Sequence, residues 1–84
     1  MNARKQLRQM LHKVPDTHGI ERLMLLEQVA DLAQSVHDEE LLALTAKPGG
    51  QSALARELGI SRQAVSMRVQ HARKRLERTQ QDAR

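Results

Sequence analysis

The sequence predicts an all-α protein of about five helices in one compact domain. Residues that break helices gather at three places, which are residues 15–19, residues 48–50 and Gly59. Between these places, apolar residues recur every three or four positions, which aligns them along one face of a helix. At 84 residues, the chain is near the lower limit for burying a core alone. Association with a second copy is therefore attractive.

The first predicted helix covers residues 3–13 and is basic. Its apolar stripe consists of Leu7, Met10, Leu11 and Val14, spaced i, i+3, i+4 and i+7. Pro15 ends this helix, and Asp16 or Thr17 can cap the helix that follows.

The second predicted helix, residues 19–36, is apolar over about half of its circumference. The apolar residues are Leu23, Leu25, Leu26, Val29, Ala30, Leu32, Ala33 and Val36. So wide a face suits a helix between two layers, and the second layer is either the first helix or another copy of the chain. We expect residues 1–37 to form a dimerisation segment. Its predicted interface comprises Leu23, Leu25, Leu26, Val29, Leu32 and Val36.

A third, short helix is predicted after Asp38, which is a plausible N-cap for it, with two acidic residues in its first turn. Three leucines of this helix are expected to face inward: Leu41, Leu42 and Leu44. It ends at the breaker of residues 48–50.

Residues 51–78 are predicted to form two further helices around a sharp turn. The first directs Leu54, Ala55 and Leu58 toward the core. Gly59 allows a positive φ at the turn, Ile60 fills it, and Ser61 caps the next helix. The second helix buries a stripe of Val65, Val69, Ala72 and Leu76, and residues 79–84 are expected to be a frayed tail.

This pattern resembles the helix-turn-helix family over residues 38–78, and most closely region 4 of the sigma-70 factors. The string that carries the resemblance is LGISRQAVSMRVQHARKRL, residues 58–76. The resemblance implies a long recognition helix that reads bases near its N-terminal end. The predicted base-reading residues are Arg62, Gln63, Ser66, Met67 and Gln70. Arg62 suits guanine and Gln63 suits adenine.

The charge distribution favours the same helix as a DNA-binding surface. Residues 61–78 carry six basic residues against Glu77, whereas residues 14–46 carry seven acidic residues against Arg22. The predicted phosphate contacts are Gln51, Ser52, Ser61, Arg68, Arg73 and Lys74. Arg75 and Arg78 are expected to pair with neighbours such as Glu77 or with a partner subunit. Because the chain has no Phe, Tyr or Trp, double-stranded DNA is favoured over single strands, which stack on aromatic rings.

Other classes of function lack their signals. The chain has no cysteine, and its four histidines form no i, i+4 pair, so we expect no metal and no other cofactor. No nucleophile motif or phosphate-binding glycine loop points to an enzyme. No effector pocket is evident, and no apolar run is long enough for a membrane span, so we expect a cytoplasmic protein.

These observations predict a homodimeric transcriptional repressor that binds an inverted-repeat operator. Compact regulators without a ligand are similar to those encoded by plasmids and phages, including the Kor-type plasmid repressors. Two alternatives stay open at this point. One is a sigma region 4-like adaptor that binds RNA polymerase, and the other is a DNA-binding antitoxin that uses residues 1–36 to bind a toxin.

Overall fold

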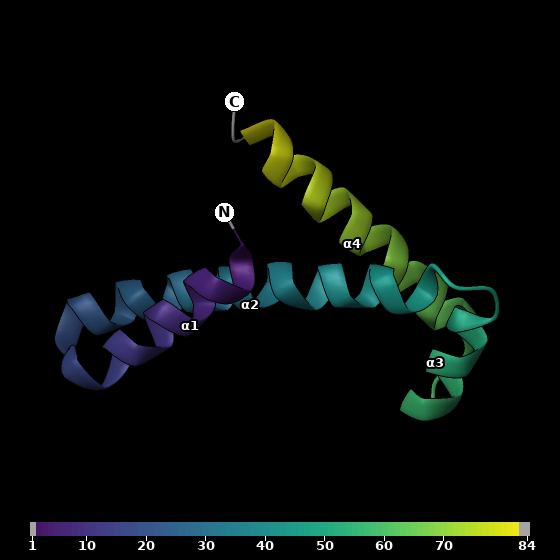
Figure 1. The fold of residues 1–84 in the computed structure, drawn as a ribbon, viewed down its shortest axis with the longest axis horizontal. Helices are drawn as coiled ribbons and strands as arrows, with labels where there is room; N and C mark the ends of the chain where they lie inside the picture. Colours follow the sequence, from purple (N-terminus) through teal and green to yellow (C-terminus); the bar gives the residue numbers. More distant parts are fainter. Residues whose placement is uncertain (1, 83–84) are drawn as a thin grey trace. The chain divides into compact units, whose positions relative to one another are not determined.

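The computed structural model describes residues 2–82 and, through residue 78, their side chains. This part of the chain is entirely helical, with four α-helices, one short 3-10 turn and no strand (Figure 1). The α-helices are α1 (Ala3–Lys13), α2 (Gly19–Thr45), α3 (Gly50–Leu58) and α4 (Arg62–Asp82), and the 3-10 turn η1 is Val14–Asp16. None of the described helices combines the length and the apolar character that a bilayer span requires.

The chain divides into two compact units, Met1–Val36 and His37–Arg84. Helix α2 contributes its first eighteen residues, 19–36, to the first unit and its remaining nine to the second. The first unit therefore consists of α1, η1 and most of α2. The second consists of the end of α2 together with α3 and α4.

Local hydrogen bonds shape the ends of the elements in the first unit. Asn2 caps α1, because its Oδ1 accepts a hydrogen bond from the backbone N–H of Arg4 at 2.8 Å. After α1, both the backbone N–H and the hydroxyl of Thr17 donate to the carbonyl of Val14, at 3.3 and 2.9 Å. Gly19, with a φ of 64°, then begins α2.

No described residue of the first unit is fully buried. Some apolar residues are half-buried. They are Leu7, Met10 and Val14 in α1 and η1, and Leu25, Val29, Leu32 and Val36 in α2. Several large apolar side chains are more than 40% exposed: Leu11, Ile20, Leu23, Met24 and Leu26. Leu11 thus departs from the stripe predicted for α1. The first unit has no core of its own.

The two helices predicted at residues 19–36 and after Asp38 are one continuous helix, α2, which corrects the predicted count of five. No glycine or proline interrupts the chain between Gly19 and Pro48, so nothing in the backbone forces a break. Asp38 is inside α2 and is not an N-cap. Its side chain, only 1% exposed, is bound by Arg75 of α4.

The second unit contains the hydrophobic core. The buried apolar residues are Leu41, Ala55, Val65, Val69 and Ala72, and Leu42, Leu54 and Ile60 pack against them. The predicted stripe of α4 is confirmed, with Val65 and Ala72 fully buried and Leu76 half-buried. Two leucines predicted to face inward are about half exposed, Leu44 at 48% and Leu58 at 50%. Leu44 is the next-to-last residue of α2 and Leu58 is the last residue of α3, so both lie at a helix end.

Candidate nucleic-acid interface

The connection between α3 and α4 is a tight turn held by backbone hydrogen bonds. The N–H of Gly59 donates to the carbonyl of Arg56 at 3.3 Å, and the N–H of Ile60 donates to the carbonyl of Ala55 at 3.0 Å. This pair of bonds is the Schellman motif, which requires a left-handed residue after the helix. Gly59 supplies it, with the positive φ expected from the sequence, 68°. Ile60 then packs on the core. The turn and this contact together fix the direction in which α4 begins.

Ser61 caps α4 as predicted. Its hydroxyl oxygen accepts a hydrogen bond from the backbone N–H of Ala64 at 3.0 Å, and its carbonyl accepts one from Val65 at 3.2 Å. Ser61 is exposed, as are the next two residues, Arg62 and Gln63. The N-terminal turn of α4 therefore presents polar and basic side chains to the solvent.

The start of α3 is built from two glycines. Gly49, with a φ of 75°, occupies the N-cap position and has no side chain to close the helix end. Gly50 lies against the end of α2, because a Cβ built on it would approach the carbonyl oxygen of Leu44 to 2.4 Å. Of the two predicted phosphate contacts here, Ser52 is exposed and Gln51 is half-buried.

Helix α4 carries two parallel stripes on opposite sides. The buried stripe is Val65, Val69, Ala72 and Leu76, and the exposed stripe is Gln63, Met67, Gln70 and Lys74. Each exposed residue precedes a buried one by two positions, which is a rotation of about 200° on a helix. Met67 is 52% exposed although it is apolar. The exposed stripe is long and polar at three of its four positions, and the acidic Glu77 lies beside it, seven residues after Gln70.

The remaining predicted contacts of α4 lie between the exposed and the buried stripe. At 100° per residue, Arg62, Ser66 and Arg73 lie on one side, and Arg68 lies on the other, nearer the buried stripe. The three arginines are exposed and Ser66 is half-buried. The predicted base-reading and phosphate-contacting residues of α4 are thus all at least partly accessible.

Arg75 has a different environment from the other basic residues of α4. Its Nε donates to Oδ2 of Asp38 at 2.8 Å, and a terminal guanidinium nitrogen donates to Oδ1 at 2.9 Å. The hydrogen bond to Asp38 raises the pKa of Arg75 further above its already high ordinary value. Nδ1 of His37 lies 3.0 Å from the same Oδ1. Arg75 therefore ties α4 to the end of α2, and within the chain its partner is Asp38 and not the predicted neighbour Glu77.

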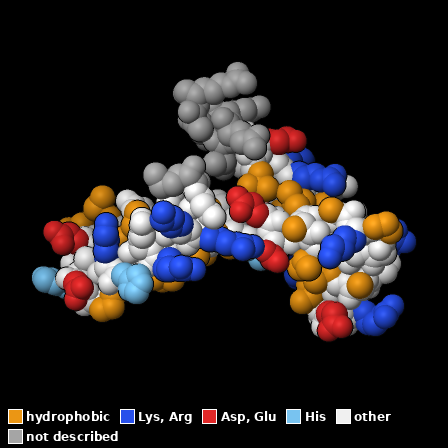
Figure 2. All heavy atoms as spheres, in the orientation of Figure 1, with side chains coloured by type: hydrophobic (Ala, Val, Ile, Leu, Met, Phe, Trp, Pro, Cys, Tyr) orange, Lys and Arg blue, Asp and Glu red, His pale blue; other side chains and the backbone are white. Residues whose placement is uncertain are grey.

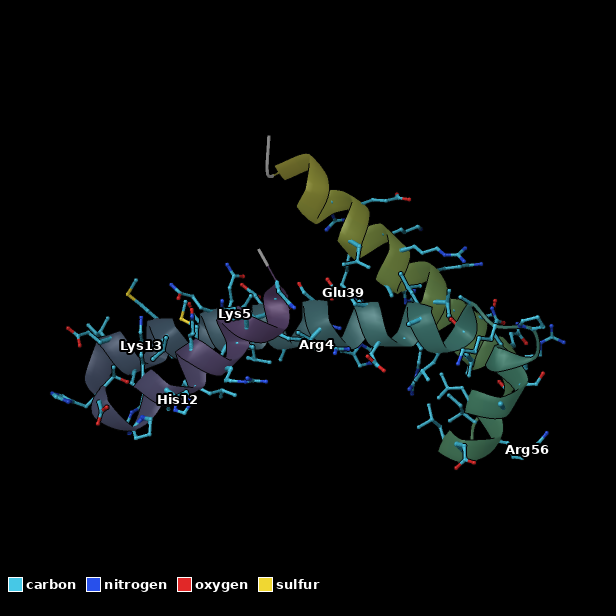
Figure 3. The ribbon with its side chains drawn as sticks, in the orientation of Figure 1. Arg4, Lys5, His12, Lys13, Glu39 and Arg56 are labelled. Atoms are coloured by element: carbon cyan, nitrogen blue, oxygen red, sulfur yellow. The ribbon has the colours of Figure 1, made fainter. Side chains whose placement is uncertain are left out.

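Three residues outside the predicted set also belong to this surface. His71 and Arg78 are exposed and follow Met67 and Lys74 by four residues, so they extend the exposed stripe. Arg56 projects from the outer side of α3 (Figure 3). The i, i+4 spacing could have identified the first two from the sequence. In the space-filling view, Lys and Arg side chains are spread over α3 and α4 (Figure 2).

Comparisons of the chain with known protein families, with curated proteins and with solved structures found no match. The surface can therefore be described only by its own chemistry. Amide, guanidinium and ammonium groups line one side of a helix whose other side is anchored in the core. Such a surface offers hydrogen-bond donors and positive charge along one side of a helix.

Proposed function

We propose that this protein is a sequence-specific double-stranded DNA-binding repressor, in which α3, the Gly59 turn and α4 form a helix-turn-helix. The observation that carries the proposal is the pair of stripes on α4. One stripe anchors the helix in the core, and the opposite stripe is polar at three of its four positions, basic at Lys74 and flanked by the acidic Glu77. A recognition helix requires that division of its surface.

The chemistry of the exposed surface supports specific as well as nonspecific contacts. Arg62 can donate two hydrogen bonds to guanine, and Gln63 can pair with adenine in the major groove. Arg68, Arg73 and Lys74 are exposed cations at positions suited to phosphates. Arg75 is excluded from this set, because its guanidinium is bound to Asp38.

We further propose that the repressor acts as a homodimer on an inverted repeat. One helix-turn-helix of this size buries too little surface for tight, specific binding, and two copies related by a two-fold axis overcome that limit. Recognition helices of such dimers are about 34 Å apart, or a multiple of that distance. The exposed apolar side chains of the first unit are the natural surface for joining the two copies.

The test is to select bound duplexes from a random DNA library with the purified full-length chain. We expect an enriched inverted repeat, bound by two chains per duplex and weakened steeply by salt. Enrichment of no sequence, together with binding to purified RNA polymerase in the absence of DNA, would refute the repressor and favour the polymerase adaptor.

A further inference from the structure

Within the first unit, α2 carries two distinct apolar stripes. One is half-buried and consists of Leu25, Val29, Leu32 and Val36. The other is exposed and consists of Leu23, Leu26, Ala30 and Ala33, with Leu23 at 58% and Leu26 at 43% exposure. At 100° per residue, the centres of the two stripes are about 110° apart. The wide apolar surface of α2 therefore comprises two faces in different environments.

The half-buried stripe has its counterpart inside the chain. Leu7, Met10 and Val14 are half-buried in the same compact unit, on the apolar side of α1 and its end. In Figure 1 the ribbon of α1 overlaps the first part of α2, and the two helices run in opposite directions. The exposed stripe has no such counterpart among the described residues of this unit. Since none of these residues is fully buried, the helical hairpin gains little from burial as a single chain.

The order of large and small residues in the exposed stripe is self-complementary. When two copies of α2 run antiparallel with Gln28 level with its counterpart, Leu23 faces Ala33 of the other copy and Leu26 faces Ala30. Each pair occurs twice, once with the leucine from one copy and once with the leucine from the other, as two-fold symmetry requires. Leucine fills the space that alanine leaves, so the helices can approach to about 8 Å, the close end of the usual range. A parallel pair would instead set leucine on leucine and alanine on alanine, with uneven gaps.

We propose that a second copy of this chain covers the exposed stripe through an antiparallel α2–α2 contact centred on Gln28. The proposal rests on the homodimer of the proposed function and specifies its interface. It assigns Leu23, Leu26, Ala30 and Ala33 to the contact between copies. The other four residues predicted for dimerisation, Leu25, Val29, Leu32 and Val36, form the face toward α1 within each chain. Asp31 and Gln28 lie on the far side of α2 and face solvent.

Disulfide trapping tests the direction and register of the contact. The chain has no cysteine, so single variants report single sites. We expect Leu23→Cys and Ala33→Cys to form a mixed disulfide when the two proteins, one carrying a mass tag, are mixed and oxidised. Either variant alone should form little, because residues 23 of the two copies are about 15 Å apart along the axis. A disulfide requires Cα atoms within about 7 Å.

Gln28→Cys is the matched control, since it lies on the same helix but on the opposite side, and it should not cross-link. Homodisulfides of Leu23→Cys would overturn the antiparallel register and indicate a parallel pair. The absence of the mixed disulfide in a chain that scatters light as a dimer would overturn the proposed face.

A swap of residue sizes provides a second test that does not depend on oxidation. Ala30→Leu sets leucine against Leu26 at two symmetric places and should weaken the dimer about tenfold or more, because overpacking is costly. Adding Leu26→Ala to the same chain exchanges the large and small positions and should restore dimerisation toward that of the unmodified protein. Analytical ultracentrifugation measures both dissociation constants. If Ala30→Leu left dimerisation unchanged or strengthened it, the large-on-small contact would be refuted.

Both tests are carried out without DNA, so their failure is separate from failure of the repressor. Mixed disulfides in a protein that selects no DNA sequence would support the proposed interface and refute the proposed repressor function. Selection of an inverted repeat by a dimer that forms no mixed disulfide would support the repressor function and refute the interface.

Discussion

At the residue scale, Asp38 and Arg75 illustrate how one buried charge constrains a small core. The Asp38 side chain is 1% exposed, whereas that of Arg75 is 43% exposed. The two partners therefore depend on each other unequally. Without Arg75, the buried carboxylate would lose both of its guanidinium hydrogen bonds while it stays in the interior. Without Asp38, the guanidinium could still be hydrated.

This asymmetry predicts that Arg75→Met destabilises the protein more than Asp38→Leu does. We expect Arg75→Met to lower the melting temperature by at least about 5 °C. The double variant should recover part of the loss, because apolar groups then replace both charges. Thermal unfolding of the three variants forms a double-mutant cycle. Equal losses for the two single variants would show that Asp38 is not the dependent partner.

The ion pair should also hold through the neutral and mildly alkaline range. Because Asp38 raises the pKa of Arg75 above its unfolded value, the stabilisation is fully present below that ordinary value. It is lost only as the pH rises through the still higher pKa of the folded state. Raising the pH from 7 to 9 should therefore leave the interaction energy between Asp38 and Arg75 unchanged, as measured by the double-mutant cycle.

Residue-scale recognition is tested by Gln63→Ala and Lys74→Ala, which remove the first and the last side chain of the exposed stripe. Gln63→Ala should weaken binding to the selected operator about tenfold, with little effect on random DNA, because a base contact is lost. Lys74→Ala should weaken binding to both, because a phosphate contact carries no sequence information. Arg22→Ala, an exposed cation of the first unit, is the control and should change neither. Unchanged operator preference after Gln63→Ala would show that this stripe does not read bases.

At the scale of elements, the close approach of α3 to the end of α2 depends on one glycine. A Cβ at Gly50 would meet the Leu44 carbonyl oxygen, which is backbone and has little freedom to move. Gly50→Ala should therefore destabilise the protein by about 1–3 kcal/mol, although alanine favours helices intrinsically. Ser52→Ala, two residues along the same helix, should have a small effect. Urea unfolding measures both, and a stabilised Gly50→Ala would mean that the two segments separate readily.

The elements also show which features local sequence signals can predict. Gly59, Ser61 and the Val65 stripe act within a few residues of their partners, so propensity and spacing identified them. The length of α2 was missed because Asp38 has the chemistry of an N-cap. Its actual partner, Arg75, is 37 positions away, and no periodicity reports a contact at that distance. The exposed positions of α4 were predictable from helical spacing. The burial of Leu44 and Leu58 was not, because it depends on where neighbouring segments end.

At the scale of the whole molecule, the proposed dimer doubles every phosphate contact. With Arg68, Arg73 and Lys74 of each copy on phosphates, the logarithm of the binding constant should fall against the logarithm of salt with a slope of about −5. Lys74→Ala removes one contact per copy and should reduce the slope by about 2. Binding isotherms at several salt concentrations give both values. A slope near −1 for the unmodified protein would contradict the predicted set of contacts.

The offset of two residues between the stripes of α4 has an evolutionary consequence. Gln63, Met67 and Gln70 are exposed, so we expect that mutation can replace them while folding is preserved. Under the proposed function, substitutions at these three positions redirect the protein to a new operator without compensating changes in the core. A duplicated gene could then diverge in its targets through these side chains.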